Sequence, residues 1–276
     1  MAGKRRKVFT IMTNSEENID YSNIDVKFQG EVGILTLNRA SQLNVMTMQT
    51  LREIRKAFDQ FLDSDVRAVI ITGSGKAFCA GADIGEMVKL SYKDAKGYSE
   101  EGHRILEIIE NFSKPVIAAL NGFVFGGGCE LALACDMRIA SEKVKIGQPE
   151  IKLGIICGWG ATQRLPKIIG KSKALKLIFS GEIFNAEEAE KMGLVDKVVD
   201  PQILMEETMK LAKDFAVKPP LALAEAKKAI VFGLNNNITR GMNFEAECFA
   251  NCFKTSDQKE GMRAFLEKRD PVFKGE

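Results

Sequence analysis

Two glutamates in glycine-rich segments are the residues best suited to acid–base chemistry. Glu130 follows the glycine run 126–128 and precedes the apolar residues 131–134. Glu150 follows Pro149, whose ring fixes the backbone next to the carboxylate. Two carboxylates in different surroundings have separated pKa values, so one can accept a proton while the other donates one. Spacing alone does not show that the two residues meet, and an ordinary surface position remains the alternative for Glu150.

Two segments could supply backbone hydrogen-bond donors to the same chemistry. The glycine run 126–128 leads into a short predicted helix, which gives unhindered amides at the positive end of a helix dipole. Such amides suit a developing oxyanion, and losing one donor of this kind typically costs about 100- to 1,000-fold in rate. The small residues 79–82 after a predicted strand would let a ligand approach the backbone closely. A flexible turn at 126–128 and a tight turn at 79–82 are the alternatives without function.

Alternating strands and helices must position these segments. Periodicity predicts two strands within 25–39 that turn near Gly30, and further strands at 66–72, 116–120, 137–140 and 195–199. It predicts helices over 47–62 with Thr47 as the cap, over 91–112 and over 130–134. Residues 201–265 are almost entirely helical in pattern. We therefore expect an α/β core at 25–200 and a helical C-terminal region at 201–276, packed as one unit, after a flexible tail at 1–24.

Composition excludes several classes of protein. The 276 residues carry a net charge of only +2, which argues against a dedicated nucleic-acid binder, and no apolar run is long enough to cross a membrane. The basic start, Lys4–Lys7, lacks the apolar segment of a signal peptide, and an RNA-binding arm is a distant alternative. The six cysteines form no CxxC pair and, with the single His103, no zinc motif. They predict reduced thiols in a cytoplasmic protein without a metal.

Two nucleotide-binding motifs fail on inspection. Gly73 and Gly75 begin like a dinucleotide fingerprint, but Phe78 occupies the place of its third glycine. Residues 170–172 end like a phosphate-binding loop, but Leu165 stands where the first glycine belongs. His103 has no partner motif and is interpreted as structural.

Several separated motifs, in the right order through residues 25–273, resemble the crotonase superfamily of enoyl-CoA hydratases and isomerases. The stretch GADI at 81–84 resembles the first oxyanion-hole segment of that family, and GGGCE at 126–130 resembles the second. The stretch GQPE at 147–150 resembles the loop that carries the second catalytic glutamate of the hydratases. Three further landmarks are similar as well: TQRL at 162–165, GLV at 193–195 and EGMRAF at 260–265.

The resemblance implies a spiral of ββα units whose helical C-terminal region makes trimer contacts, as a homotrimer or a dimer of trimers. It implies an acyl-CoA thioester substrate, no bound cofactor and no metal. The implied reaction is the reversible addition of water to a trans-2-enoyl-CoA, a lyase step of fatty-acid β-oxidation. Because both glutamates are present, hydration is favoured over an isomerase, which usually keeps one acid–base group.

The resemblance also assigns roles to single residues. Glu130 and Glu150 would hold and activate the water, and the amides of Ala82 and Gly127 would bind the thioester oxygen. The amide of Gly158 would help to position the water. Trp159 stands where smaller residues are common and would shape the acyl pocket or simply fill the core. The complete set expected to line the substrate site is Ala80, Ala82, Asp83, Ile84, Gly126, Gly127 and Trp159.

Overall fold

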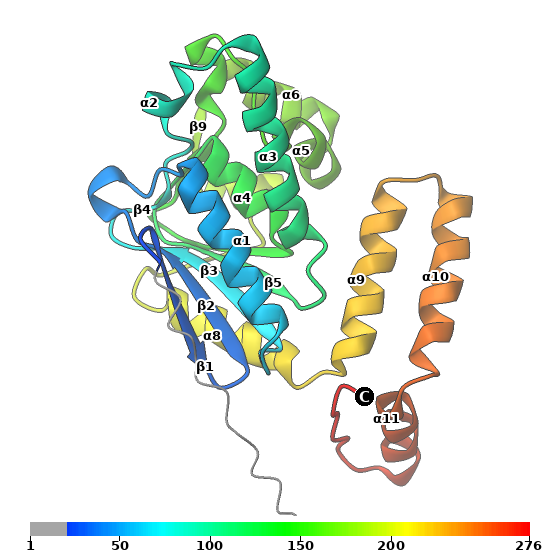
Figure 1. Cartoon of the computed structure of the whole chain (residues 1–276). Coiled ribbons are helices and arrows are strands. Elements are labelled where there is room, and N and C mark those ends of the chain that lie inside the picture. The colour runs from blue at the N-terminus through cyan, green and yellow to red at the C-terminus, as the bar shows by residue number, and fades with distance from the viewer. Residues whose placement is uncertain (1–20) are drawn as a thin grey trace, which may run out of the picture.

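Two sheets form the centre of the protein (Figure 1), which is described here from a computed structural model over residues 21–276. Most of the predicted tail, including Lys4–Lys7, lies outside the described residues. The larger sheet has the strand order β1-β2-β3-β5-β7-β10, and the smaller one has the order β4-β6-β8-β9. The strands of the larger sheet are β1 (Ile24–Gln29), β2 (Val32–Leu37), β3 (Ala68–Gly73), β5 (Val116–Leu120), β7 (Met137–Ser141) and β10 (Lys197–Val199). Those of the smaller sheet are β4 (Ala77–Cys79), β6 (Phe123–Phe125), β8 (Lys145–Gly147) and β9 (Ile183–Asn185).

The two sheets are built by a repeating path of the chain. Each turn adds one strand to the larger sheet and the next strand to the smaller one, in the pairs β3–β4, β5–β6 and β7–β8. Neighbouring turns pair in parallel in both sheets. This is the spiral of ββα units that the resemblance predicts, and it stacks the loops and helices after β4, β6 and β8 at one end of the molecule.

The helices predicted over 47–62, 91–112 and 130–134 are present, and four further helices between residues 84 and 192 were not predicted. Thr47 caps α1 through a hydrogen bond from the backbone N–H of Thr50 to its side chain. The helices are α1 (Met48–Leu62), α2 (Ile84–Met87), α3 (Tyr92–Glu110), α4 (Gly127–Ala134), α5 (Ala161–Ile169), α6 (Lys171–Ser180), α7 (Ala186–Met192), α8 (Leu204–Ala216), α9 (Pro220–Leu234), α10 (Ile238–Cys252) and α11 (Ser256–Glu267). None of those between residues 21 and 276 has the length and apolar character to cross a membrane.

The core lies on both faces of the larger sheet. On one face, α1, α3 and α4 pack against alternate strand residues such as Val69 and Ile71. On the other face, α8 buries Leu204 and Ala212 against the intervening residues, among them Ile70. The first helix of the region 201–276 is therefore part of the core, and residues 21–24 also pack, since the backbone N–H of Asn23 donates to the Glu53 carboxylate at 2.8 Å.

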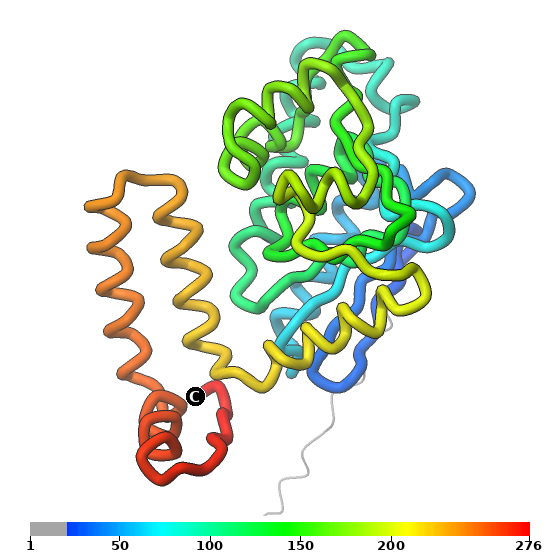
Figure 2. The backbone as a smooth tube through the Cα atoms, turned by 180° about the vertical axis from the view of Figure 1, so that it is seen from behind, coloured from blue at the N-terminus to red at the C-terminus, as the bar shows by residue number. Residues whose placement is uncertain are grey.

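Helices α9 and α10 form an antiparallel arm beside the core, and α11 with the C-terminus lies at its base (Figures 1 and 2). The two helices pack mainly on each other. Lys227 on α9 ties the arm to the core through an ion pair with Asp136 at 2.8 Å. Arg67 reaches the base of the arm and donates to the carbonyl of Phe273 at 3.1 Å.

Candidate active site

A cleft of about 1290 Å³ opens where the loops after β4, β6 and β8 meet. Its walls come from residues 80–103, from the start of α4 and from residues 149–162. Both Glu130 and Glu150 line it, so the fold brings together the two carboxylates that are 20 positions apart in the sequence. Most of the remaining lining is apolar, which gives the two acids a poorly hydrated setting.

Glu130 is held rigidly in the first turn of α4. Its side chain is buried, with a residue exposure of 2%. The backbone N–H groups of Trp159 and Ala161 both donate to its Oε1, at 2.7 and 2.9 Å. Burial raises the pKa of Glu130 to about 7, with a further contribution from the charge of Glu150, while the two N–H donors oppose the rise. A carboxyl group with this pKa can exchange a proton near neutral pH.

Glu150 lies on the opposite segment, in a short 3-10 helix (η2, Pro149–Leu153) that begins with the proline singled out in the sequence. Its side chain is half-buried, and burial raises its pKa. One side-chain amide atom of the fully buried Gln148 lies 2.8 Å from Glu150 Oε1, 3.1 Å from Glu150 Oε2 and 3.3 Å from the carbonyl of Gly126. All three neighbours are acceptors, so the orientation that satisfies hydrogen bonding assigns this atom as the NH₂ group. Gln148 thus connects the carboxylate to the glycine run before α4.

The two expected oxyanion segments lie against each other. The parallel bridge between Met46 and Ala82 uses the N–H groups of Met46 and Asp83, and no hydrogen bond from the amide of Ala82 occurs within residues 21–276. The amide of Gly127, at the first position of α4, is also without an acceptor in that part of the chain. A Cβ added at Gly127 would come within 3.3 Å of the Ala82 nitrogen, so the two amides face one small region of the cleft.

Gly126 needs to be glycine for two reasons. Its φ of +50° is unfavourable for residues with a side chain. An added Cβ would also lie 3.2 Å from Glu150 Oε1. The flexible turn considered for residues 126–128 is therefore a fixed turn that packs against the second glutamate.

The other expected site residues divide into two groups. Ala80, Ile84, Gly158 and Trp159 line the cleft. Asp83 also borders it, but its Oδ1 accepts from the backbone N–H groups of Gly85 and Glu86 and so caps α2. The fold uses the Asp83 carboxylate as a helix cap. The backbone of Asp83 is also paired, because its N–H donates to the carbonyl of Met46 and its carbonyl accepts from the N–H groups of Glu86 and Met87.

Several residues of the cleft were not found from the sequence. Tyr98 and Ser99 on α3 line it, and the Ser99 hydroxyl donates to the carbonyl of Gly158. Cys157 is buried beside Glu150 and opposes the rise of its pKa. His103, interpreted as structural, is exposed and borders the cleft. Helical periodicity shows which residues share one face of a helix, but it does not show which loop of the folded chain packs against that face.

The raised pKa of Glu130 should make the stability of the folded protein depend on pH. A carboxyl whose pKa is raised in the folded state binds more protons there than in the unfolded chain, so its contribution to stability falls as pH rises from about 4.5 to 7. Glu130→Gln keeps an oxygen for the two N–H donors and has no charge. We expect the variant to unfold at a higher urea concentration than the parent at pH 8, because its free energy of unfolding should be larger by up to about 3 kcal/mol. This difference should disappear toward pH 5. A pH-independent difference in urea midpoint would contradict the raised pKa.

Comparison with known proteins places the chain in a family. Residues 27–276 match the family model described as enoyl-CoA hydratase/isomerase. The chain is 46% identical to the crotonyl-CoA hydratase of Syntrophomonas wolfei over 92% of this chain and 98% of the relative. It is 42% identical to the short-chain-enoyl-CoA hydratase of Clostridium acetobutylicum over 91% of this chain and 97% of that protein. The crystal structure of an enoyl-CoA hydratase from Bacillus anthracis superposes with a TM-score of 0.88 at 39% identity, covering 92% of this chain and all of that one. On the fold, the paired glutamates and these matches, the chain belongs to the enoyl-CoA hydratase/isomerase family.

Proposed function

We propose that this protein is an enoyl-CoA hydratase that adds water to the 2,3 double bond of a trans-2-enoyl-CoA. The observation that carries the proposal is the pair Glu130 and Glu150 in one apolar cleft with the free amides of Ala82 and Gly127. The relatives named crotonyl-CoA hydratase and short-chain-enoyl-CoA hydratase support it.

In the proposed reaction, the thioester oxygen accepts hydrogen bonds from the amides of Ala82 and Gly127. The water oxygen forms a bond to C3, one proton of the water passes to a carboxylate, and the other carboxyl group supplies a proton to C2. The electron pair of the double bond moves toward the thioester as the C3–O bond forms. Because the thioester oxygen becomes more negative in this step, donors aimed at it stabilise the transition state more than the substrate.

Neighbouring groups would hold each of the two glutamates in position for proton transfer. The N–H groups that hold Glu130 leave its second oxygen free for water, and Gln148 orients Glu150 from the other side. The amide of Gly158, at the border of the cleft, completes the proposed water site. These residues can carry out the reaction without a bound cofactor or metal.

Crotonyl-CoA is the substrate for the decisive test. The purified protein should remove the ultraviolet absorbance of the conjugated thioester and yield a product heavier by one water. A product of unchanged mass with the double bond moved would instead indicate the isomerase. No reaction with crotonyl-CoA or with longer enoyl-CoAs would contradict hydratase activity. The RNA-binding alternative depends on Lys4–Lys7, outside the described residues, and is tested by salt-dependent RNA retention before and after deletion of residues 1–7.

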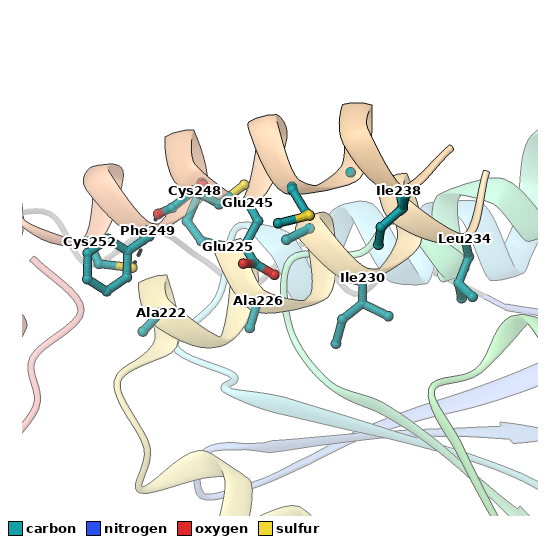
Figure 3. A pocket seen from close by; sticks show the side chains of 14 residues that line it. Ala222, Glu225, Ala226, Ile230, Leu234, Ile238, Glu245, Cys248, Phe249 and Cys252 are labelled. Atoms are coloured by element: carbon teal, nitrogen blue, oxygen red, sulfur yellow. Dashed lines mark hydrogen bonds between the residues drawn. The ribbon is translucent and has the colours of Figure 1, made fainter. Parts of the chain in front are cut away.

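We further propose that the arm joins copies of this chain into a trimer or a dimer of trimers. An apolar groove of about 570 Å³ runs between α9 and α10 (Figure 3). Exposed apolar side chains continue from it onto α11, which is unusual for a surface that stays in water. They include Ile230, Leu234, Ile238, Met242, Phe249, Phe253, Phe265 and Leu266. A second copy of the chain is the partner proposed to cover this surface, since most soluble oligomers are built from copies of one chain.

A charged residue placed in the proposed subunit contact should break the assembly into smaller species. Phe249 is 65% exposed on α10, so Phe249→Asp should leave the monomer folded but place an unpaired charge in the subunit contact. We expect the parent to sediment as a trimer or hexamer and this variant as smaller species. Leu62→Asp, at an exposed residue of the core, is the matched control and should keep the parent's mass. Sedimentation of the parent as a monomer would remove the proposal.

A further inference from the structure

Two aromatic side chains stand beside the candidate catalytic groups. Trp159 and Tyr98 both line the cleft, with ring centroids 5.4 Å apart and planes inclined by 31°. Trp159 is only 2% exposed, so its indole fills space between surrounding elements. The Tyr98 hydroxyl is buried and has no hydrogen-bond partner within residues 21–276. The pair therefore forms a dense wall made mainly of ring surface.

The indole of Trp159 is wedged between two glycines from different helices. A Cβ on Gly102, in the middle of α3, would lie 2.1 Å from its Cδ1. A Cβ on Gly127, at the start of α4, would lie 2.5 Å from its Cζ3. Distances below 3 Å are steric overlaps, so the ring occupies space that exists only because both residues lack side chains. Glycine inside a helix is otherwise unfavourable, and contact with the indole explains Gly102.

The backbone of Trp159 is fixed as firmly as its ring. Its N–H donates to Glu130 Oε1 at 2.7 Å, and its carbonyl accepts from Arg164 Nη1 at 3.0 Å. Arg164 is anchored in turn by an ion pair with Glu110 on α3 at 2.7 Å. With backbone and ring both restrained, the indole forms a stationary wall rather than a gate that swings aside.

The wall stands beside the groups that are proposed to act on the reacting carbons of the substrate. Trp159 contacts Gly127, whose amide would bind the oxygen on C1, and it holds Glu130, which would act on the water at C3. We propose that Trp159, backed by Tyr98, ends the acyl pocket just beyond C4 and restricts the enzyme to short-chain enoyl-CoA thioesters. This rests on the proposed hydratase function and names the residue that sets its substrate class. A longer chain would have to displace a ring that is 2% exposed and packed against Gly102 and Gly127.

The test measures kcat/KM for trans-2-enoyl-CoAs of four, six, eight and ten carbons. Since one methylene too many can be discriminated about 10- to 200-fold in a closed apolar pocket, we expect kcat/KM of the parent to be at least about 100-fold lower for eight carbons than for four. In Trp159→Ala, which keeps the N–H donor to Glu130, the ratio of eight-carbon to four-carbon kcat/KM should rise about tenfold or more. The ratio cancels any general loss of active enzyme. Phe28→Ala, which removes a half-exposed ring on β1, is the control and should leave the ratio unchanged.

Binding of saturated acyl-CoAs to the parent gives a second measurement, which needs no variant. Butyryl-CoA should bind more tightly than octanoyl-CoA. Equal kcat/KM for four and eight carbons, or an unchanged ratio in folded Trp159→Ala, would overturn the role of Trp159 and leave hydratase activity standing. Tighter binding of butyryl-CoA without hydration of any enoyl-CoA would overturn the hydratase function and retain the closed pocket. If Trp159→Ala does not fold, the parent's two chain-length profiles decide.

Discussion

Replacing Glu130 or Glu150 with glutamine is expected to lower kcat for crotonyl-CoA hydration by about 10²- to 10⁴-fold, because each variant loses one of the two positioned proton transfers. Glutamine keeps the size of the side chain and, at position 130, an oxygen for the N–H groups of Trp159 and Ala161. Binding of the thioester should change far less than kcat, since the amides of Ala82 and Gly127 remain. Steady-state kinetics on crotonyl-CoA, with KM and kcat reported separately, checks this.

Glu187→Gln is the matched control for both variants. Glu187 is exposed on α7, where it pairs with Lys191, and it does not line the cleft. Its replacement should leave kcat within about twofold of the parent, since surface ion pairs contribute little. A parent-like rate in either Glu130→Gln or Glu150→Gln would show that one carboxylate suffices, and the two-glutamate mechanism would have to be abandoned.

Gly127→Ala is expected to reduce kcat/KM for crotonyl-CoA by about 100- to 1,000-fold, the effect of losing one oxyanion donor. The added methyl group would lie 2.5 Å from Trp159 Cζ3 and 3.3 Å from the Ala82 nitrogen. To relieve that overlap, the start of α4, the indole of Trp159 or the segment around Ala82 must move. Any of these movements would displace the two amides from their shared region of the cleft. The same movement should lower the melting temperature, so circular dichroism accompanies the kinetics.

Gly97→Ala is the same chemical change at a site where it should do no harm. Gly97 lies on α3 with nothing within 4 Å of an added Cβ. Because alanine favours helix more than glycine does, this variant should be as active as the parent and more stable by up to about 1 kcal/mol. Parent-like activity in Gly127→Ala would show that the amide of Gly127 does not bind the thioester oxygen.

Local sequence patterns predicted most of the elements because each depends on neighbouring residues. The apolar run Val116–Leu120 is a strand with those same limits, and Thr47 caps α1 as its hydroxyl position suggested. The smaller sheet was missed. Its strands have only three residues each, too few to show a period of two, and they are stabilised by pairing with the next turn of the spiral.

The amino-acid sequence by itself determined which residues could do the chemistry: two glutamates in constrained glycine-rich segments, and backbone amides left open by small residues. Only the tertiary structure decided that they share one cleft, because parallel strands β4, β6 and β8 bring the ends of three distant segments together. Burial, which raises the pKa of Glu130 to about 7, is likewise a property of the folded chain. So is the place of Trp159, whose indole fits between Gly102 and Gly127 only when α3 and α4 are packed side by side.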